Sequence, residues 1–599
     1  MKKLYLIWKN TRRVFRRDEA VTLEFDIMNF FPHNLPGCRL TAEVAGLWRE
    51  SVELTRLATF EAGVRFNFVP SCFRRGTYQL DVTLEQAGKA LVRCSFEVGV
   101  VPARRFGGVH LWHWPSTVYY NALEADRESA FQQIDKLAAL GFTWAQLRAE
   151  WALREPVRAA ELIEYALIKG IEMGILVENG NGGVLRVNRD TPPDARLITS
   201  DGSVTQLANY RHPEVRAQIK QLAERLMLQF RDFPSCSSVF MNSEIEDKLR
   251  LPSDSESMQA HAAALGFSPE HIRRINAAFA DALPDGDFIR AGVIADTNPE
   301  YLYHKYYFKH GDGYVPVNCL LSETFRRYRP DLTIISDPIR NCSVYGRSDG
   351  LSVACSWTYT NPDPKATLFI ETLRCEAAPQ NQDVIHTITL WNYAGSLVPS
   401  GSDRFAREQT LRMEPDRLTE NAWINFSRAP LAIGTYFGSP IELTFEGGDP
   451  FIFSPATETA LSRFSAEVLR PFGELARHTI QEKRRIAVLD SCASQVYAVS
   501  PRPYNHYPAY RVYDFFAVLA MAHLPADIVF DETVEQGGLD AYDMLVLPMC
   551  DTMTESVYRQ IMAFIARGGK VVADKYLRAE LPGVIRVDER NASQRGGCR

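Results

Sequence analysis

One short apolar strand of the sequence is followed by a group of polar and acidic side chains. The strand, SSVFM, ends at Met241, and it is followed by Asn242, Ser243, Glu244, Glu246 and Asp247. Carboxylates can donate and accept protons, and a site without chemistry has no reason to keep a costly cluster of them. The segment therefore indicates acid–base chemistry. Glu244 is the first candidate for a general acid, whereas Glu246 and Asp247 fit ion pairs at a rim.

This strand belongs to a regular alternation of strands and helices. A helix is predicted before it, because apolar residues recur at helical spacing after His212 and Pro213. Eight strands are predicted, over 109–115, 145–150, 173–179, 238–244, 332–338, 351–359, 384–392 and 431–437. Helical stretches separate most of them, and this pattern is typical of a (β/α)8 TIM barrel with insertions.

Two other patterns flank the barrel. Residues 1–102 alternate apolar with polar side chains between Pro, Gly and Asn, which predicts a small antiparallel β-sandwich. The barrel is expected over 103–445 and a helical linker over 446–483. In 484–599, short continuous apolar strands alternate with helices again, which predicts a doubly wound parallel sheet. The chain as a whole is predicted to be of the α/β class.

Composition narrows the class of protein. The 599 residues are 46% hydrophobic and 23% charged, with a net charge of −6, which is ordinary for a globular protein and argues against nucleic-acid binding. The eleven cysteines are scattered and give neither a disulfide framework nor a zinc site. No run approaches the ~18 apolar residues of a membrane span, and the apolar run near the N-terminus is too short for a signal peptide. We expect a soluble cytoplasmic protein, or a periplasmic or secreted one if a signal peptide has been removed.

Several motifs make the chain similar to a known family. They are DG at 201–202, HPEVR at 212–216, FRDFPS at 230–235, MNSE at 241–244, YDMLVLPM at 542–549 and ARGGKVVAD at 566–574. In the order of its elements the chain resembles the retaining β-galactosidases of glycoside hydrolase family 42 and their relatives in the same barrel clan. The resemblance implies a C-terminal trimerisation domain like class I glutamine amidotransferases, a homotrimer, a β-galactoside as default substrate, and no metal or organic cofactor.

The resemblance also implies roles for individual residues. The acid/base of the clan is a glutamate at the end of strand four, where this chain has Glu244 in the order Asn-Ser-Glu rather than Asn-Glu. The nucleophile of the clan is a glutamate at the end of strand seven, where this chain has Trp391, Asn392 and Tyr393. This departure leaves open whether the mechanism is retaining.

A second carboxylate is needed because glycosidic cleavage requires an acid for the leaving oxygen and a nucleophile or base. It must come from another strand end at the C-terminal face of the barrel. Asp337 is the first candidate, because the proline after it terminates strand five. Glu178 at the end of strand three is the second, and Glu150 after strand two is a further one. A separation of about 5–5.5 Å from Glu244 would predict retention, and about 6.5–9.5 Å inversion.

Aromatic and polar side chains at the strand ends predict a sugar pocket, because aromatic faces stack on the apolar face of a pyranose. The predicted substrate-binding residues are Trp112, His113, Arg148, Asn242, Trp357, Tyr359, Trp391 and Asn392. We therefore expect hydrolysis of a glycosidic bond in an oligo- or polysaccharide. The sequence leaves the sugar and the linkage open.

Two other functions compete with this prediction. A non-catalytic carbohydrate-binding or scaffolding protein is favoured by the missing glutamate of strand seven and opposed by the acidic cluster of strand four. A cysteine hydrolase with Cys550 as nucleophile is disfavoured. The residues after Cys550 are Asp-Thr-Met-Thr, whereas a nucleophile elbow is flanked by glycine.

Overall fold

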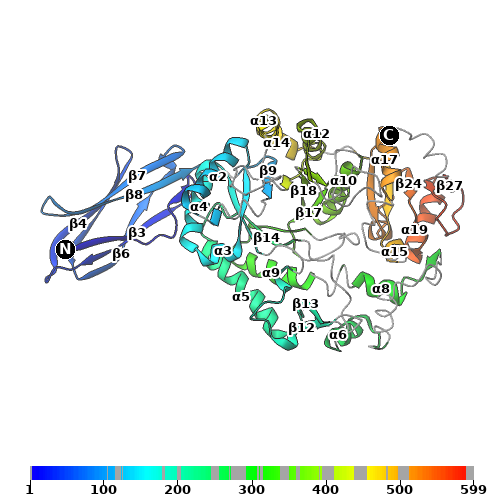
Figure 1. Cartoon of the computed structure of the whole chain (residues 1–599), viewed down its shortest axis with the longest axis horizontal. Coiled ribbons are helices and arrows are strands. Elements are labelled where there is room, and N and C mark those ends of the chain that lie inside the picture. Colours follow the sequence, from blue (N-terminus) through cyan, green and yellow to red (C-terminus); the bar gives the residue numbers. More distant parts are fainter. Residues whose placement is uncertain are drawn as a thin grey trace.

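The chain forms three bodies along one axis: a sandwich at the N-terminal end, a barrel in the middle and a parallel sheet at the C-terminal end (Figure 1). This computed structural model describes residues 3–103, 106–114, 123–124, 126–177, 183–198, 204–243, 255–268, 270, 292–306, 309, 315–337, 350–358, 364–389, 391–393, 410–436, 455–479, 483–496 and 512–587. Within these residues, no helix is both long and apolar enough to cross a membrane.

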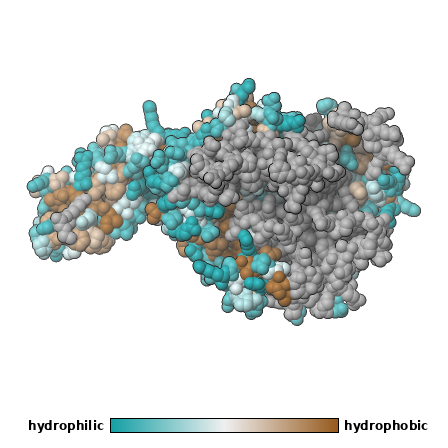
Figure 2. Space-filling view, viewed as in Figure 1, coloured by the Kyte–Doolittle hydropathy of each residue, from teal (hydrophilic) through white to brown (hydrophobic). Residues whose placement is uncertain are grey.

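The N-terminal body is the predicted β-sandwich. Its strands are β1 (Leu4–Trp8), β2 (Val14–Arg16), β3 (Val21–Asn29), β4 (Leu35–Val44), β5 (Trp48–Leu57), β6 (Phe60–Phe68), β7 (Gly76–Gln86) and β8 (Lys89–Val101). They form sheets of order β1-β3-β6 and β2-β8-β7-β4-β5. Every second residue is buried along β3, as at Leu23 and Phe25, since alternate side chains of a strand face the same side. Its outer surface mixes hydrophilic with hydrophobic residues (Figure 2).

The central body is an eight-stranded parallel barrel, as predicted. Its strands are β9 (His110–Trp114), β10 (Trp144–Arg148), β11 (Glu172–Leu176), β14 (Ser238–Ser243), β16 (Thr333–Asp337), β17 (Val353–Thr358), β18 (Asp383–Thr389) and β21 (Ala432–Tyr436). They pair in the order β16-β14-β11-β10-β9-β21-β18-β17. Ser352 closes the ring between β16 and β17, because its N–H donates to the Ile334 carbonyl at 2.9 Å.

Helices cover the outside of the barrel. They are α2 (Arg127–Leu140), α3 (Ala149–Arg154), α4 (Pro156–Lys169), α5 (Pro213–Phe230), α9 (Val315–Tyr328), α10 (Pro364–Ala377), α12 (Pro415–Phe426), α13 (Pro455–Phe464) and α14 (Arg470–Arg477). Helix α5 begins after His212, as its sequence indicates, because Pro213 is pre-organised for a first helical turn. Leu461 and Phe464 of α13 pack into the core of the barrel, so part of the segment expected as a linker completes this layer.

Bulky aromatic rings fill the inside of the barrel. Trp112 lies with its ring centroid 5.7 Å from those of Trp144 and Phe240. Gly174 leaves room beside the ring of Trp144, since a Cβ there would lie 3.3 Å from the Trp144 Nε1 and 2.5 Å from the Ser238 hydroxyl oxygen. The barrel is therefore a packed core, and any substrate must bind at its end.

The predicted strand over 384–392 is shorter in the structure. Strand β18 ends at Thr389, and β19 (Trp391–Tyr393) pairs antiparallel with β20 (Thr410–Arg412). This hairpin joins segments far apart in the sequence, so periodicity alone could not separate it from the strand before it. The predicted strand over 145–150 is also shorter, because α3 begins at Ala149 and takes up Glu150.

The C-terminal body is a five-stranded parallel sheet. Its strands are β22 (Ile486–Asp490), β23 (Ala526–Phe530), β24 (Met544–Leu547), β26 (Lys570–Ala573) and β27 (Ile585–Arg586), in the order β23-β22-β24-β26-β27. Helices α15 (Cys492–Val496), α17 (Tyr513–Met521), α18 (Asp531–Glu535) and α19 (Glu555–Ala566) accompany it. The first strand lies inside the sheet and the second on its edge, which is the order of a doubly wound fold.

A buried carboxylate joins the barrel to the C-terminal sheet. Glu371 of α10 is 1% exposed and accepts two hydrogen bonds from Arg484, at 2.7 and 2.8 Å. Arg428 and Arg374 donate to it at 2.9 and 2.8 Å. Burial alone would raise the pKa of Glu371, but these guanidinium groups outweigh it and lower the pKa to about 2. Glu371 lies on α10, outside the barrel interior, and it has a structural role.

Candidate active site

The ends of β14 and β16 lie side by side at the C-terminal face of the barrel. Phe240 pairs with Ile335, Asn242 with Ser336, and Ser243 with Asp337. The register shifts between Phe240 and Asn242, so two residues of β14 span the distance covered by one residue of β16. Such a bulge re-aims the side chains that follow it. Glu244 follows Ser243 directly in the sequence and lies outside the described residues.

Asp337 faces the mouth of the barrel. Ile335 shares the face of its partner Phe240, whose ring packs on Trp112 inside the barrel. Residues two apart on a strand share a face, so the Asp337 side chain points to the interior at the last position of β16. It is 5% exposed. The structure thus brings the second predicted carboxylate to the strand next to the one that leads into Glu244.

Asn242 faces the helices instead of the mouth. Its amide nitrogen donates to Asn318 of α9 at 3.2 Å, and its amide oxygen accepts from the Val184 N–H at 3.1 Å. The Ser336 hydroxyl donates to its backbone carbonyl at 3.1 Å. Asn242 is fully buried, so its side chain fixes the end of β14 through these hydrogen bonds.

Aromatic rings lie at three other strand ends of the mouth. Trp114 and Tyr436 are paired across β9 and β21, with ring centroids 6.2 Å apart. Trp357 ends the inward face of β17 and is half-buried. Its neighbour Thr358 faces outward, where it contacts the buried ring of His386. These rings give the mouth the apolar faces that a pyranose ring stacks on.

Arg148 supplies a cation at the end of β10. It shares the inward face of Trp144, and its guanidinium donates to Glu124 at 2.7 Å. Arg154 lies 3.7 Å from the same carboxylate. Arg148 was predicted from the sequence, but Glu124 was not, because the sequence around Glu124 does not distinguish it from other acidic residues near the start of a helix. A carboxylate, a cation and aromatic faces around one opening can bind a polyhydroxylated ring and exchange protons with it.

Two predicted substrate-binding residues are packed away from the opening. Trp112 lies one layer below Trp114, inside the barrel. His113 faces outward from β9, where its ring meets Phe142 at 5.4 Å, and it is fully buried. Period-two alternation places neighbours on opposite faces, so the run of aromatic residues at 112–114 could not all face a sugar.

The structure does not describe the side chains of the remaining predicted residues. Glu178 and Tyr359 lie outside the described residues, as Glu244 does. The backbones of Trp391 and Asn392 lie in β19, paired with Arg412 and Leu411 of β20.

Comparisons with known proteins bear on the fold. No protein-family model matches the sequence, and no curated protein is significantly similar to it. Among solved structures, it is similar to the β-galactosidase of the psychrophilic Marinomonas ef1, at a TM-score of 0.54 and 13% identity over 78% of this chain and 76% of that one. The chain has the fold of these β-galactosidases. A cold-adapted β-galactosidase from Rahnella sp. R3 aligns at 0.57 with 11% identity over 78% and 71% of the two chains. A GH42 β-galactosidase from G. stearothermophilus aligns at 0.56 with 10% identity over 78% and 72%.

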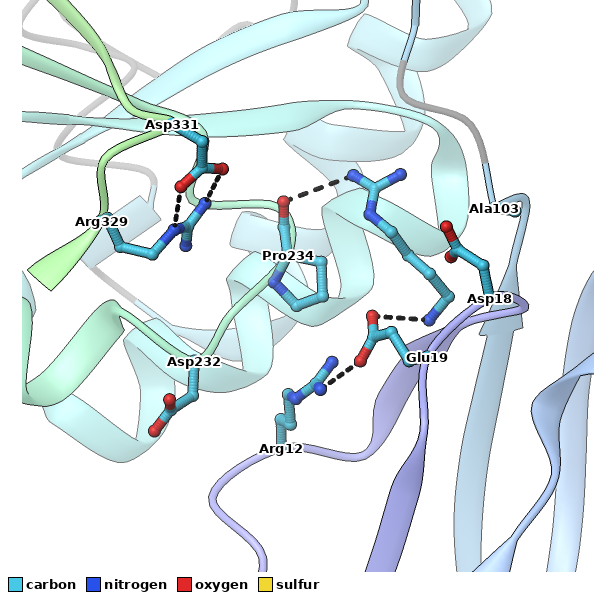
Figure 3. Close-up of a pocket in the computed structure, with 9 residues that line it drawn as sticks. Arg12, Asp18, Glu19, Ala103, Asp232, Pro234, Arg329 and Asp331 are labelled. Carbon is cyan, nitrogen blue, oxygen red and sulfur yellow. Dashed lines mark hydrogen bonds and ion pairs between the residues drawn. The ribbon is translucent and has the colours of Figure 1, made fainter.

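A separate cleft of about 440 Å³ lies at the opposite end of the barrel from this mouth. It is lined by residues of the sandwich and of the turns that lead into β14 and β16 (Figure 3). Arg329 pairs with Asp331, Arg12 with Glu19, and Arg16 donates to the Pro234 carbonyl. Because these charges satisfy one another and lie at the amino ends of the strands, the cleft is a junction between bodies rather than a catalytic site.

In the part of the chain that the structure describes, no group of three His, Cys, Asp or Glu side chains could hold a metal ion. Asn318 supports the site through Asn242, and it is not among the residues predicted from the sequence. A buried amide among the apolar positions of an amphipathic helix, as in VPVNCLL, is the signal that could have revealed it.

Proposed function

We propose that this protein is a glycoside hydrolase whose active site is the mouth of the barrel at the carboxyl ends of its strands. The observation that carries the proposal is the pairing of Asp337 with Ser243, the residue before Glu244. The barrel's aromatic strand ends and its fold, shared with β-galactosidases, support the same assignment. The active sites of such barrels lie at this face.

Glu244 is the proposed general acid that protonates the leaving oxygen. Asp337 is the proposed second carboxylate, which attacks the anomeric carbon or activates a water, and Glu178 is the reserve candidate. The distance between the two carboxyl groups sets the stereochemistry, about 5–5.5 Å for retention and about 6.5–9.5 Å for inversion. Trp114, Trp357 and Tyr436 would stack on the sugar, while Arg148 would bind its hydroxyls or an acidic group.

The proposed substrate is a β-galactoside in an oligo- or polysaccharide. This choice rests on the similar structures described as β-galactosidases. The proposed assembly is the homotrimer that the sequence resemblance implies. The exposed apolar residues Val518, Met521 and Leu524 on or beside α17 offer a surface that such an assembly would bury, and light scattering of the purified protein tests the oligomeric state.

The test is turnover of aryl galactosides, mannosides, fucosides and glucuronides of both anomers by the parent and three variants. Glu244→Gln and Asp337→Asn should each lower kcat by about 10²–10⁴, the usual contribution of a general acid or base. Glu150→Gln is the matched control, because Glu150 follows β10 on α3 with its side chain 88% exposed. Product NMR then reports the anomer formed. Full activity in Asp337→Asn would refute its role.

One observation favours a second candidate, a carbohydrate-binding protein without hydrolytic activity. Between Val384 and Tyr393, where the clan has its nucleophile, this chain has no acidic residue. Binding of a sugar by calorimetry, with no turnover by the parent in the panel above, would select this alternative.

A further inference from the structure

The carboxyl edge of the C-terminal sheet is covered by a segment of the barrel. Doubly wound sheets bind their ligands at this edge, between the first strand and its two neighbours. Here Cys550 follows β24 at that position, but it is 1% exposed and burial raises the pKa of its thiol. A buried thiol with a raised pKa is a poor nucleophile. Among the described residues, this edge therefore has no open reactive cysteine, and residues 292–306 together with Lys309 lie against it.

Backbone pairing fixes the start of this segment. Strand β15 (Val293–Ile294) pairs in parallel with β25 (Met553–Thr554), and the Met553 N–H donates to the Gly292 carbonyl at 3.2 Å. Asp296 then caps the first turn of α19, accepting from the Ser556 N–H at 2.9 Å and its hydroxyl at 2.6 Å. The segment thus adds a strand and a helix cap to the C-terminal body.

Buried side chains continue the contact. Helix α8 (Pro299–Lys305) places Tyr301, 2% exposed, in a cluster with Cys492 and Ala493 at the end of β22. Lys309 is fully buried and its Nζ lies 2.5 Å from the Glu532 carboxylate. Lys305 lies farther from Glu532, at 3.6 Å, and is more exposed. A buried ion pair needs both partners, because either charge alone is strongly destabilising.

The same segment leads back to the candidate active site. It belongs to the connection between β14, which ends at Ser243, and β16, which ends at Asp337. After Lys309 the chain enters α9, and Asn318 in its first turn accepts the hydrogen bond from Asn242 at 3.2 Å. One end of this connection is therefore held by the C-terminal sheet and the other by the strand that carries the proposed acid.

We propose that the C-terminal sheet serves as a clamp for the described parts of the β14–β16 connection, and that Lys309 and Glu532 are positioning residues for the end of β14, which α9 contacts through Asn318 and Asn242. The clamp stands on the contacts above, whereas its effect on catalysis rests on the proposed function. In other doubly wound sheets the carboxyl edge binds a small ligand, whereas here a segment of the β14–β16 connection occupies this edge.

Hydrogen exchange followed by mass spectrometry tests the clamp without any substrate. Lys309→Met and Glu532→Gln should each speed exchange of the amides of 292–306 at least tenfold. Lys570→Met is the control, because Lys570 is an exposed lysine at the start of β26, and its exchange should stay within twofold of the parent. The double variant Lys309→Met/Glu532→Leu replaces both charges by apolar groups and should return within threefold of the parent, since such replacements are often neutral. Unchanged exchange in both single variants, or tenfold faster exchange in the double variant, would overturn the clamp.

Turnover separates this inference from the proposed function. If the parent is a glycosidase, Lys309→Met should lower kcat about tenfold with KM within twofold, and the double variant should recover most of it. Faster exchange with unchanged kcat would overturn the positioning role and leave the clamp. A parent inactive on every glycoside would count against the proposed function alone, because the exchange results stand without it. If the single variants do not fold while the double variant does, the coupling between the two residues is established by that contrast.

Discussion

Replacing Glu371 with Gln should destabilise the protein more than any loss of a surface charge. The carboxylate is 1% exposed and binds Arg374, Arg428 and Arg484. The variant keeps the shape of the side chain but leaves three guanidinium groups without their counter-charge. Removing one partner of a buried ion pair costs about 3–5 kcal/mol.

The pKa of Glu371 gives a second estimate of the same cost. The change from the ordinary 4.5 to about 2 corresponds to about 3 kcal/mol at 1.36 kcal/mol for each pH unit. Because the pKa is lower in the folded chain than in the unfolded one, this stabilisation is complete above about pH 4.5 and is lost as the pH falls through about 2. The difference between parent and variant should therefore be constant from pH 5 to 7 and shrink below pH 4.5.

Urea unfolding followed by tryptophan fluorescence measures this difference. At pH 7 we expect the free energy of unfolding of Glu371→Gln to be lower by about 3 kcal/mol. Glu467→Gln is the control, because Glu467 pairs with Arg463 at 3.0 Å with both side chains more than half exposed, and such pairs contribute about 0.3–0.5 kcal/mol. Equal stability of parent and Glu371→Gln at pH 7, or a difference that grows below pH 4.5, would refute the reasoning.

Three further substitutions test other parts of the structure. Burial raises the pKa of Asp490 to about 7. The stabilisation that the neutral carboxyl group contributes is therefore complete below about pH 3.8 and is lost as the pH rises through 7. Asp490→Asn should remove this loss, so the free energy of unfolding of the variant should change less between pH 4 and 8 than that of the parent. Burial likewise raises the pKa of Glu164 to about 7. Its carboxylate lies at the sandwich–barrel junction, where it accepts from the Val14 N–H at 2.7 Å. In the parent, the exchange rate of the β2 amides, corrected for its intrinsic pH dependence, should rise between pH 5 and 8, whereas in Glu164→Gln it should stay constant. Asn242→Ala removes the bonds to Asn318 and Val184 and should cost about 1–3 kcal/mol of stability, together with a fall in kcat that a distant alanine substitution of equal cost does not cause.

Much of the fold could be predicted because it follows from local periodicity. Short apolar runs such as the one ending at Met241 and amphipathic stretches such as α5 carry their own signal, so all eight barrel strands were predicted within a few residues. What could not be predicted depends on pairing between distant segments. The bulge in β14 turns Asn242 from the mouth towards Asn318, and alternation buries His113 behind β9.

The contacts between the three bodies could not be predicted from the sequence either. The bond between Asp296 and Ser556 joins residues 260 positions apart, and no local pattern around either residue records it. Asp337 was predicted because a proline follows it directly, a signal that needs only two residues. Local signals therefore placed the strand ends, and tertiary packing decided which side chains face the mouth.

The segment of residues 292–306 and Lys309 changes where this chain can be divided into fragments. A fragment holding only the C-terminal strands would lack Tyr301, which packs against Cys492 and Ala493, and would leave Glu532 without Lys305 and Lys309. A fragment ending before β22 would expose Tyr301 to water. A boundary placed in the sequence between the barrel and the C-terminal sheet therefore does not separate two units that fold independently. We expect the barrel and the C-terminal sheet to unfold in one transition, and truncation at their junction to yield insoluble protein on both sides of the cut.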